Sequence, residues 1–170
     1  YPSLITGGHN TYQVNFSQNP VYVQSPKTDV LLALNQETLT LHKDELSQDS
    51  IVIYDAQNTK TPIADLGLSA KTIDVPLKRL AQEAGGKELM ANNVGLGAAA
   101  YLMGLDLAIL NSTIADVFTG KSAQIIETDQ KAATAGFNFA KSKMQTKSIN
   151  LTTQNPNNLT MTGNEALALG

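Results

Sequence analysis

The sequence predicts an α/β protein of three layers (α/β/α), with helices on both faces of a mixed, mostly parallel sheet. Residues 29–34 and 50–55 are short, largely apolar runs without alternation, which is typical of strands that are covered on both faces. Segments with helical spacing alternate with these runs along the chain. A strand–helix–strand order favours parallel neighbours, because two parallel strands need a crossover connection and a helix supplies it.

The N-terminal part of the chain predicts a hairpin, a strand and a helix. Residues 11–16 alternate apolar and polar side chains, and residues 21–23 follow a Gln-Asn-Pro turn signal, so these two segments form the expected hairpin. After the strand at residues 29–34, Asn35 is a suitable N-cap for a helix. The leucines that we expect to face inward are Leu39, Leu41 and Leu46.

The middle of the chain predicts two further strands and a short helix. Residues 50–55 and 70–75 form the strands. Pro76 suits the start of a helix over residues 77–84, because its fixed φ is already helical and its missing N–H is not needed there. An adjacent pair of glycines ends this helix.

The C-terminal part predicts three helices and a polar linker. A stretch rich in small residues is followed by two amphipathic stretches, and the chain then becomes polar, with an Asn-Pro-Asn-Asn sequence. The helices are expected at residues 94–103, at residues 106–118, and from Ser122 or Thr128 to Lys143. The linker is expected over residues 145–161, and residues 162–170 resemble the first turns of another helix.

The composition excludes several classes of function. With 170 residues, 42% hydrophobic and 16% charged, the chain fits one soluble domain with one core. Its net charge is −3 and Arg79 is its single arginine, so it lacks the clustered cations of a nucleic-acid surface. It contains no cysteine for a disulfide or a thiolate metal site. Its longest apolar run, residues 94–105, is too short to cross a membrane, and we expect a cytoplasmic protein.

The segment Gly7-Gly8-His9-Asn10 is the first candidate ligand site. Glycine permits positive φ and close approach of the backbone, and His and Asn form hydrogen bonds without adding a fixed charge. A lone histidine without a visible partner is nevertheless more often structural than a general base. The other histidine, His42, lies beside three charged residues at a predicted helix end, which favours a surface role.

A second candidate is Gly95-x-Gly97, which is similar to part of a dinucleotide-binding fingerprint. That fingerprint lies between a strand and a helix, whereas the preceding residues predict no strand, so close packing between helices is the preferred interpretation. Asn93, just before these glycines, either caps a helix, which we prefer, or faces a ligand. Asp55 ends a predicted parallel strand, where open α/β sheets bind ligands, or it caps the following turn.

Neither a catalytic residue nor a metal ligand is assigned, because no triad, metal-ligand spacing or phosphate loop is visible in the sequence. The candidates that face a ligand or an interface are Gly7, Gly8, His9, Asn10 and Asn93.

Several segments, taken in this order, resemble the γ domain of the 2-oxoacid:ferredoxin oxidoreductases. They are residues 1–10 (YPSLITGGHN) with the following Gln13-Val14, 29–34 (DVLLAL), 51–55 (IVIYD), 73–77 (IDVPL), 93–98 (NVGLGA) and 135–137 (AGF). Residues 162–170 (TGNEALALG) are similar to the opening of the α domain of these enzymes, the pyrimidine-side thiamine-diphosphate domain. The order γ then α is the layout of the fused α subunit of the 2-oxoglutarate and general 2-oxoacid types.

The resemblance implies a division of the chain. Residues 1–144 correspond to the γ domain, residues 145–161 to a linker and residues 162–170 to the start of the α domain. The family domain normally begins with a strand and a glycine-rich loop before the Tyr-Pro-Ser segment, so we expect the sheet to be incomplete at its N-terminal side. Thr6 stands where relatives commonly have Arg, which puts an anion contact at that position in doubt.

The resemblance also implies a function. The enzymes of this family decarboxylate a 2-oxoacid oxidatively to an acyl-CoA, using thiamine diphosphate, Mg²⁺, [4Fe-4S] clusters and coenzyme A, and pass the electrons to ferredoxin. The γ domain serves the coenzyme A side and subunit assembly. The implied partners are the remainder of the α subunit, a β subunit and ferredoxin, in an oligomer. We expect this part alone to bind none of the cofactors and to be inactive.

Two alternatives remain at this point. The chain is a non-catalytic α/β binding or interaction module, as the small-residue helix at residues 94–103 and the lack of a complete site suggest. Alternatively, it is a nucleotide-binding domain that uses Gly95-x-Gly97, which requires a strand that ends just before Gly95.

Overall fold

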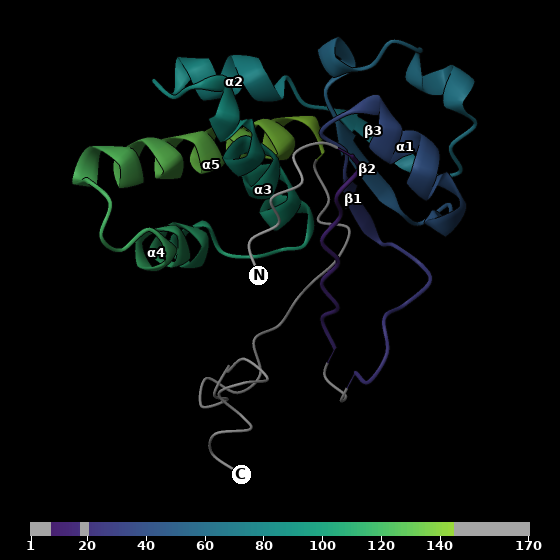
Figure 1. Cartoon of the computed structure of the whole chain (residues 1–170), viewed down its shortest axis with the longest axis horizontal. Helices are drawn as coiled ribbons and strands as arrows, with labels where there is room; N and C mark the ends of the chain where they lie inside the picture. The colour runs from purple at the N-terminus through teal and green to yellow at the C-terminus, as the bar shows by residue number, and fades with distance from the viewer. Residues whose placement is uncertain (1–7, 18–20, 145–170) are drawn as a thin grey trace.

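The computed structural model describes residues 8–17 and 21–144 and arranges them in three layers (Figure 1). The strands are β1 (Val30–Leu32), β2 (Ile51–Tyr54) and β3 (Lys71–Asp74). The α-helices are α1 (Gln36–His42), α2 (Leu77–Glu83), α3 (Ala91–Leu102), α4 (Leu107–Val117) and α5 (Ala123–Lys143). Short 3-10 helices lie at Lys43–Glu45, Ala56–Asn58, Ile63–Leu66 and Glu88–Met90.

The strands form a parallel sheet in the order β1-β2-β3, which confirms the predicted α/β fold. The register places Val30 opposite Ile51 and Ile51 opposite Lys71. The connections from β1 to β2 and from β2 to β3 both contribute apolar side chains to the same cluster, so both pass over the same face of the sheet. The strand order therefore follows the chain order.

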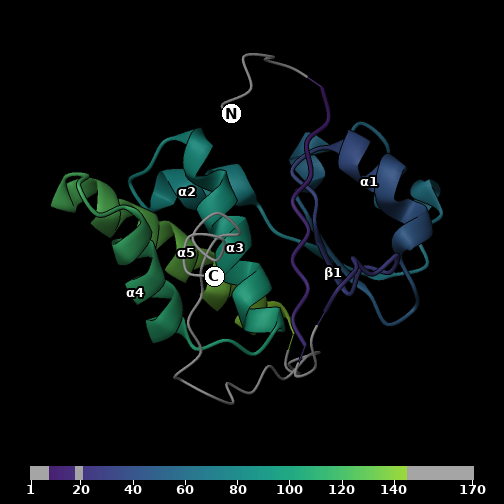
Figure 2. The same ribbon diagram turned by 60° about the horizontal axis from the view of Figure 1, so that its bottom comes forward.

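The central strand is buried on both faces, as its continuous apolar sequence predicts. Ile51 and Ile53 pack with residues of α2, α3 and α5, whereas Val52 and Tyr54 pack with residues of α1. The two faces of the sheet therefore carry separate cores. Figure 2 shows this arrangement from a second side, with α1 on one side of the molecule and the other four helices on the opposite side.

Helices α3 and α5 approach so closely that glycine is required at two positions. A Cβ atom on Gly97 would lie 1.8 Å from the backbone oxygen of Ala133, and one on Gly136 would lie 1.9 Å from that of Val94. No real Cβ contact is that short, so only glycine allows the two backbones to meet here. The close packing predicted for the small-residue helix is confirmed.

Polar side chains begin three of the helices as the sequence predicts. The side chain of Asn35 accepts a hydrogen bond from the Thr38 amide at the start of α1. Asp106 caps α4, and Ser122 caps α5, so this last helix begins at the earlier of its two predicted positions. α2 begins directly after Pro76.

The prediction that Leu41 faces inward is wrong, because its side chain is 55% exposed. Leu39, two positions earlier, is fully buried, and side chains two positions apart on a helix point to nearly opposite sides. Leu46 is buried as predicted.

The predicted hairpin is also wrong, because neither residues 11–16 nor residues 21–23 form a strand. Both segments follow an extended path without pairing into the sheet, and their apolar side chains are largely exposed. The alternation at residues 11–16 therefore does not mark a half-buried strand here. The exposed apolar side chains are Tyr12, Val14, Phe16, Val21, Tyr22 and Val23.

The predicted linker at residues 145–161 and the predicted start of an α domain at residues 162–170 lie outside the described residues. Among the residues that are described, no helix is both long and apolar enough to span a membrane.

Candidate functional site

The extended N-terminal segment brings His9 against α1. Gly8 precedes it with a φ of +91°, a conformation that favours glycine. The Nε2 atoms of His9 and His42 lie 2.9 Å apart, although 33 positions separate the two residues. The sequence shows both histidines but not that they meet.

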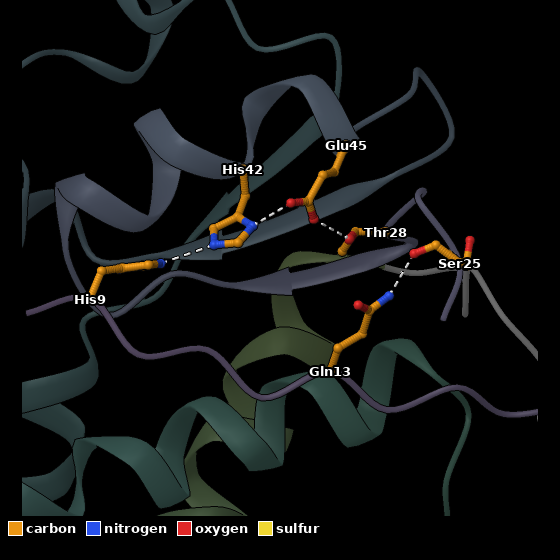
Figure 3. A network of polar contacts seen from close by, with 6 residues as sticks. All are labelled: His9, Gln13, Ser25, Thr28, His42 and Glu45. Carbon is orange, nitrogen blue, oxygen red and sulfur yellow. Dashed lines mark hydrogen bonds and ion pairs between the residues drawn. The ribbon is translucent and has the colours of Figure 1, made fainter. Parts of the chain in front are cut away.

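A chain of hydrogen bonds continues from this pair (Figure 3). The Nδ1 atom of His42 lies 2.7 Å from Oε1 of Glu45, and the Thr28 hydroxyl donates to Oε2 of Glu45 at 3.0 Å. The Thr28 amide also donates to the backbone oxygen of Glu45. The His42 side chain is only 17% exposed and is largely shielded from water, whereas the Glu45 side chain is 39% exposed and remains in contact with solvent.

The chemistry of the groups decides which atoms donate. A carboxylate only accepts hydrogen bonds, so His42 donates from Nδ1 to Glu45. The Nε2 atom of a neutral His42 is then an acceptor, and His9 must donate to it from Nε2. Nδ1 of His9 is therefore the last atom of this chain of hydrogen bonds. A neutral His9 presents a lone pair at that atom.

Further contacts hold the segment that carries His9. The side-chain amide of Gln13 donates to the backbone oxygen of Ser25 at 2.8 Å, which ties the extended segment to the residues that lead into β1 (Figure 3). The His9 and His42 rings lie 5.2 Å apart with a tilt of 39°. Among the described residues, His42 is the one hydrogen-bond partner of the His9 ring.

The other predicted residues have different surroundings. Gly7 lies outside the described residues, and Asn10 is exposed. Asn93 donates from its side-chain amide to Oδ1 of Asp129 at 2.7 Å, which joins α3 to α5. It lies within the first turn of α3 and does not cap it, since the N-cap is Met90. The structure thus brings His9 together with His42 and Glu45 but engages Asn93 in a contact between helices.

The structure rules out the nucleotide-binding alternative at Gly95-x-Gly97. Both glycines lie inside α3, and the element before α3 is a 3-10 helix rather than a strand. The Cα of Gly95 faces Leu32 of β1, and that of Gly97 faces α5. The space next to each glycine is thus occupied by a packed neighbour, Leu32 at Gly95 and α5 at Gly97.

Asp55 lies at the carboxyl end of β2 and is 2% exposed. Its Oδ1 atom accepts from the Gln57 amide, so Asp55 does cap the following turn. Its Oδ2 atom has no hydrogen-bond partner in the described part of the chain. A cavity of about 640 Å³ lies at this end of the sheet, and its lining includes Gln57, Asp74, Arg79 and Lys143.

Sequence reasoning missed His42, Glu45 and Thr28 as parts of the site. The one available signal was the spacing of His42 and Glu45, because residues three apart are neighbours on a helical turn. Within residues 8–17 and 21–144, no group of three or more His, Cys, Asp or Glu side chains is arranged to hold a metal ion.

Comparisons with known proteins agree on one family. Residues 1–139 match the family model described as pyruvate ferredoxin/flavodoxin oxidoreductase. The ketoisovalerate oxidoreductase subunit VorA of Methanothermobacter thermautotrophicus is 31% identical over 119 residues, which are 69% of this chain and 24% of that protein. The chain therefore spans about a quarter of the length of this curated relative.

Two solved structures share the fold. A 2-oxoglutarate:ferredoxin oxidoreductase from Magnetococcus marinus, solved with 2-oxoglutarate, coenzyme A and succinyl-CoA, superposes with a TM-score of 0.69 at 21% identity. The match covers 80% of this chain and 24% of that one. The γ subunit of a keto/oxoacid ferredoxin oxidoreductase from Geobacter sulfurreducens gives a TM-score of 0.57 at 25% identity, over 67% of this chain and 64% of that one.

Proposed function

Because this chain belongs to the pyruvate ferredoxin/flavodoxin oxidoreductase family, we propose that it is the γ-type domain of the fused α subunit of a cytoplasmic 2-oxoacid:ferredoxin oxidoreductase. The observation that carries the proposal is the family match over residues 1–139, which includes all three layers up to α5. The partial coverage supports a place in a larger chain, since this chain corresponds to 24% of the Magnetococcus enzyme chain.

In this proposal the enzyme converts a 2-oxoacid to an acyl-CoA and CO₂ and passes the electrons to ferredoxin. Thiamine diphosphate with Mg²⁺, [4Fe-4S] clusters and coenzyme A supply the carbanion, electron-transfer and acyl-carrier chemistry. This chain has no cysteine, so the cluster ligands come from elsewhere in the assembly. Its partners are the remainder of the α subunit, a β subunit and ferredoxin.

The domain itself serves the coenzyme A side and subunit assembly. Gly8, His9 and Asn10 are the residues that we assign to ligand or interface contact, because they lie outside the two cores and offer hydrogen bonds without a fixed charge. Gly7 belongs to the same segment in sequence. The contact between Asn93 and Asp129 favours a structural role for Asn93.

An assay of the assembled enzyme tests this function. The complete gene that encodes this chain is expressed with its partner subunit under anaerobic conditions, with thiamine diphosphate and Mg²⁺ supplied. Reduction of a viologen dye is measured with pyruvate, 2-oxoglutarate and 2-oxoisovalerate, the acids suggested by the names of the family and the relatives. We expect reduction that depends on one of these acids and on coenzyme A. Intact clusters without any such activity would contradict the proposal.

A further inference from the structure

The extended segment at residues 9–16 is held to the protein by the polar side chains of its odd-numbered positions. Successive side chains of an extended chain point to opposite sides, so odd and even positions form two rows. In the odd row, His9 contacts His42, and Gln13 donates to the Ser25 backbone oxygen (Figure 3). These two contacts fix which row faces the rest of the molecule.

The even-numbered positions carry an apolar row that faces outward. This outer row consists of Tyr12, Val14 and Phe16, whose exposed fractions are 93%, 52% and 58%. In a strand with one solvated face, the apolar row is normally the buried one. The outer row therefore has the chemistry of a buried strand face but is left uncovered by the described part of the chain.

The backbone of the same segment is also available for pairing. Within the described residues, no N–H or C=O group of residues 11–16 forms a backbone–backbone hydrogen bond. Proteins protect unpaired extended backbone from other strands with charged side chains, above all lysine, or with proline. Residues 1–26 contain no Asp, Glu, Lys or Arg, and residues 11–16 contain no proline. Neither device protects this segment.

We propose that residues 11–16 pair as an antiparallel strand with the same segment of a second copy of this chain, with Val14 at the twofold axis. The inference goes beyond the proposed function and does not depend on the reaction. The outer row is symmetric about Val14, so Tyr12 of one copy lies opposite Phe16 of the other, and aromatic pairs across strands are stabilising. Two uncharged copies also bring no like charges together.

The size of the outer row indicates where this pairing takes place. A buried aromatic side chain contributes about 150–250 Å², so Tyr12 and Phe16 at their exposed fractions offer roughly 200–400 Å². A stable interface of standard size buries about 800 Å² on each partner. The pairing therefore belongs in an assembly whose other contacts already hold two copies near one another, because a high effective concentration compensates for a small contact.

Photo-cross-linking in the assembled protein tests the pairing. The complete gene that encodes this chain is expressed with its partner subunit, and p-benzoylphenylalanine replaces Tyr12. After irradiation and proteolysis, mass spectrometry identifies the linked peptides. We expect the peptide that contains position 12 to be linked to a second copy of itself, which can arise only from two chains. The same replacement of Val117, which is 72% exposed on α4, is the control and should give no such self-link.

A substitution at the proposed axis tests the register. Val14→Lys places two like charges opposite each other and should reduce the self-link from position 12 to the level of the Val117 control. Val14→Ile keeps the apolar contact and should retain the self-link. Val14 lies outside the apolar cores, so both variants should assemble as the wild type does, as size-exclusion chromatography reports.

The outcomes are decided without an activity measurement, so an inactive enzyme leaves the test intact. Cross-links from position 12 only to another subunit, or only to a different peptide of this chain, would overturn the proposal, and so would the absence of any cross-link. A self-link that persists in Val14→Lys would overturn the pairing about Val14.

Discussion

At the scale of single residues, two buried carboxylates differ in how completely they are satisfied. Asp129 is 3% exposed and accepts from Asn93, whereas Asp55 is 2% exposed and one of its oxygens lacks a partner in the described part of the chain. A buried polar group without a hydrogen bond destabilises the fold, so the contact between Asn93 and Asp129 is expected to matter for stability.

Asn93→Ala should lower the free energy of unfolding by about 1–3 kcal/mol, because it leaves the Asp129 carboxylate buried without its donor. Chemical denaturation followed by circular dichroism measures the loss. Asn92→Ala is the control, since Asn92 is exposed on the same turn of α3 and should change the stability by less than about 0.5 kcal/mol. Similar losses in both variants would show that the hydrogen bond contributes little.

Tyr54 makes the stability depend on pH in the alkaline range. Burial, and to a smaller extent the charge of Asp74, raises the pKa of Tyr54 above its ordinary value of 10.0. The unfolded chain therefore releases this proton first, and the stabilisation that is complete below about pH 10 is lost as the pH rises through the raised pKa.

Tyr54→Phe should remove this part of the pH dependence. The free energy of unfolding of the wild type should fall more steeply than that of Tyr54→Phe above pH 10.0, and the two curves should run parallel below it. Urea denaturation at a series of pH values provides the comparison. Asp74→Asn should reduce the slope only in part, since the charge of Asp74 is the smaller cause. Parallel curves across the whole range would refute this account.

At the scale of elements, α3 and α5 pack with their backbones in direct contact. Gly97 and Gly136 each face a backbone carbonyl of the opposite helix, and a backbone cannot move aside as a side chain can. Gly95 provides the contrast, because the three atoms nearest to an added Cβ there all belong to the Leu32 side chain, the first at 2.6 Å.

Gly97→Ala and Gly136→Ala should each destabilise the protein by about 3 kcal/mol or more, despite the better helix propensity of Ala, because the helices must move apart. Gly95→Ala should cost about 1 kcal/mol, since Leu32 can change its rotamer. Thermal unfolding measured by calorimetry ranks the three variants. A Gly95→Ala variant as unstable as Gly97→Ala would show that backbone contact is not the cause.

The sequence predicted the elements well where one local signal was sufficient. The apolar runs of the buried strands are signals that involve only a few neighbouring residues. The same holds for the helix-start signals at Asn35, Pro76 and Ser122. Prediction failed where a distant partner decides the outcome. Residues 11–16 have the alternation of a strand but do not pair in the sheet. His42 resembles a surface residue until His9, 33 positions earlier, packs against it.

At the scale of the whole molecule, the sheet separates two cores that come from different parts of the chain. The core on the α1 side uses residues between Leu31 and Ala70. The core on the other side combines strand residues such as Ile51 and Ile73 with side chains as late as Ala140. The first core can thus be completed from a continuous stretch of sequence, whereas the second requires almost the whole described chain.

This division has a consequence during synthesis on the ribosome. When β3 has emerged, α1 can already cover one face of the sheet, but Ile51, Ile53 and Ile73 on the other face still await α3 and α5. At a translation rate of about 5–20 residues per second, the uncovered face persists for roughly several seconds before Ala140 emerges. The nascent chain therefore passes through a stage in which this apolar face of the sheet is not yet covered.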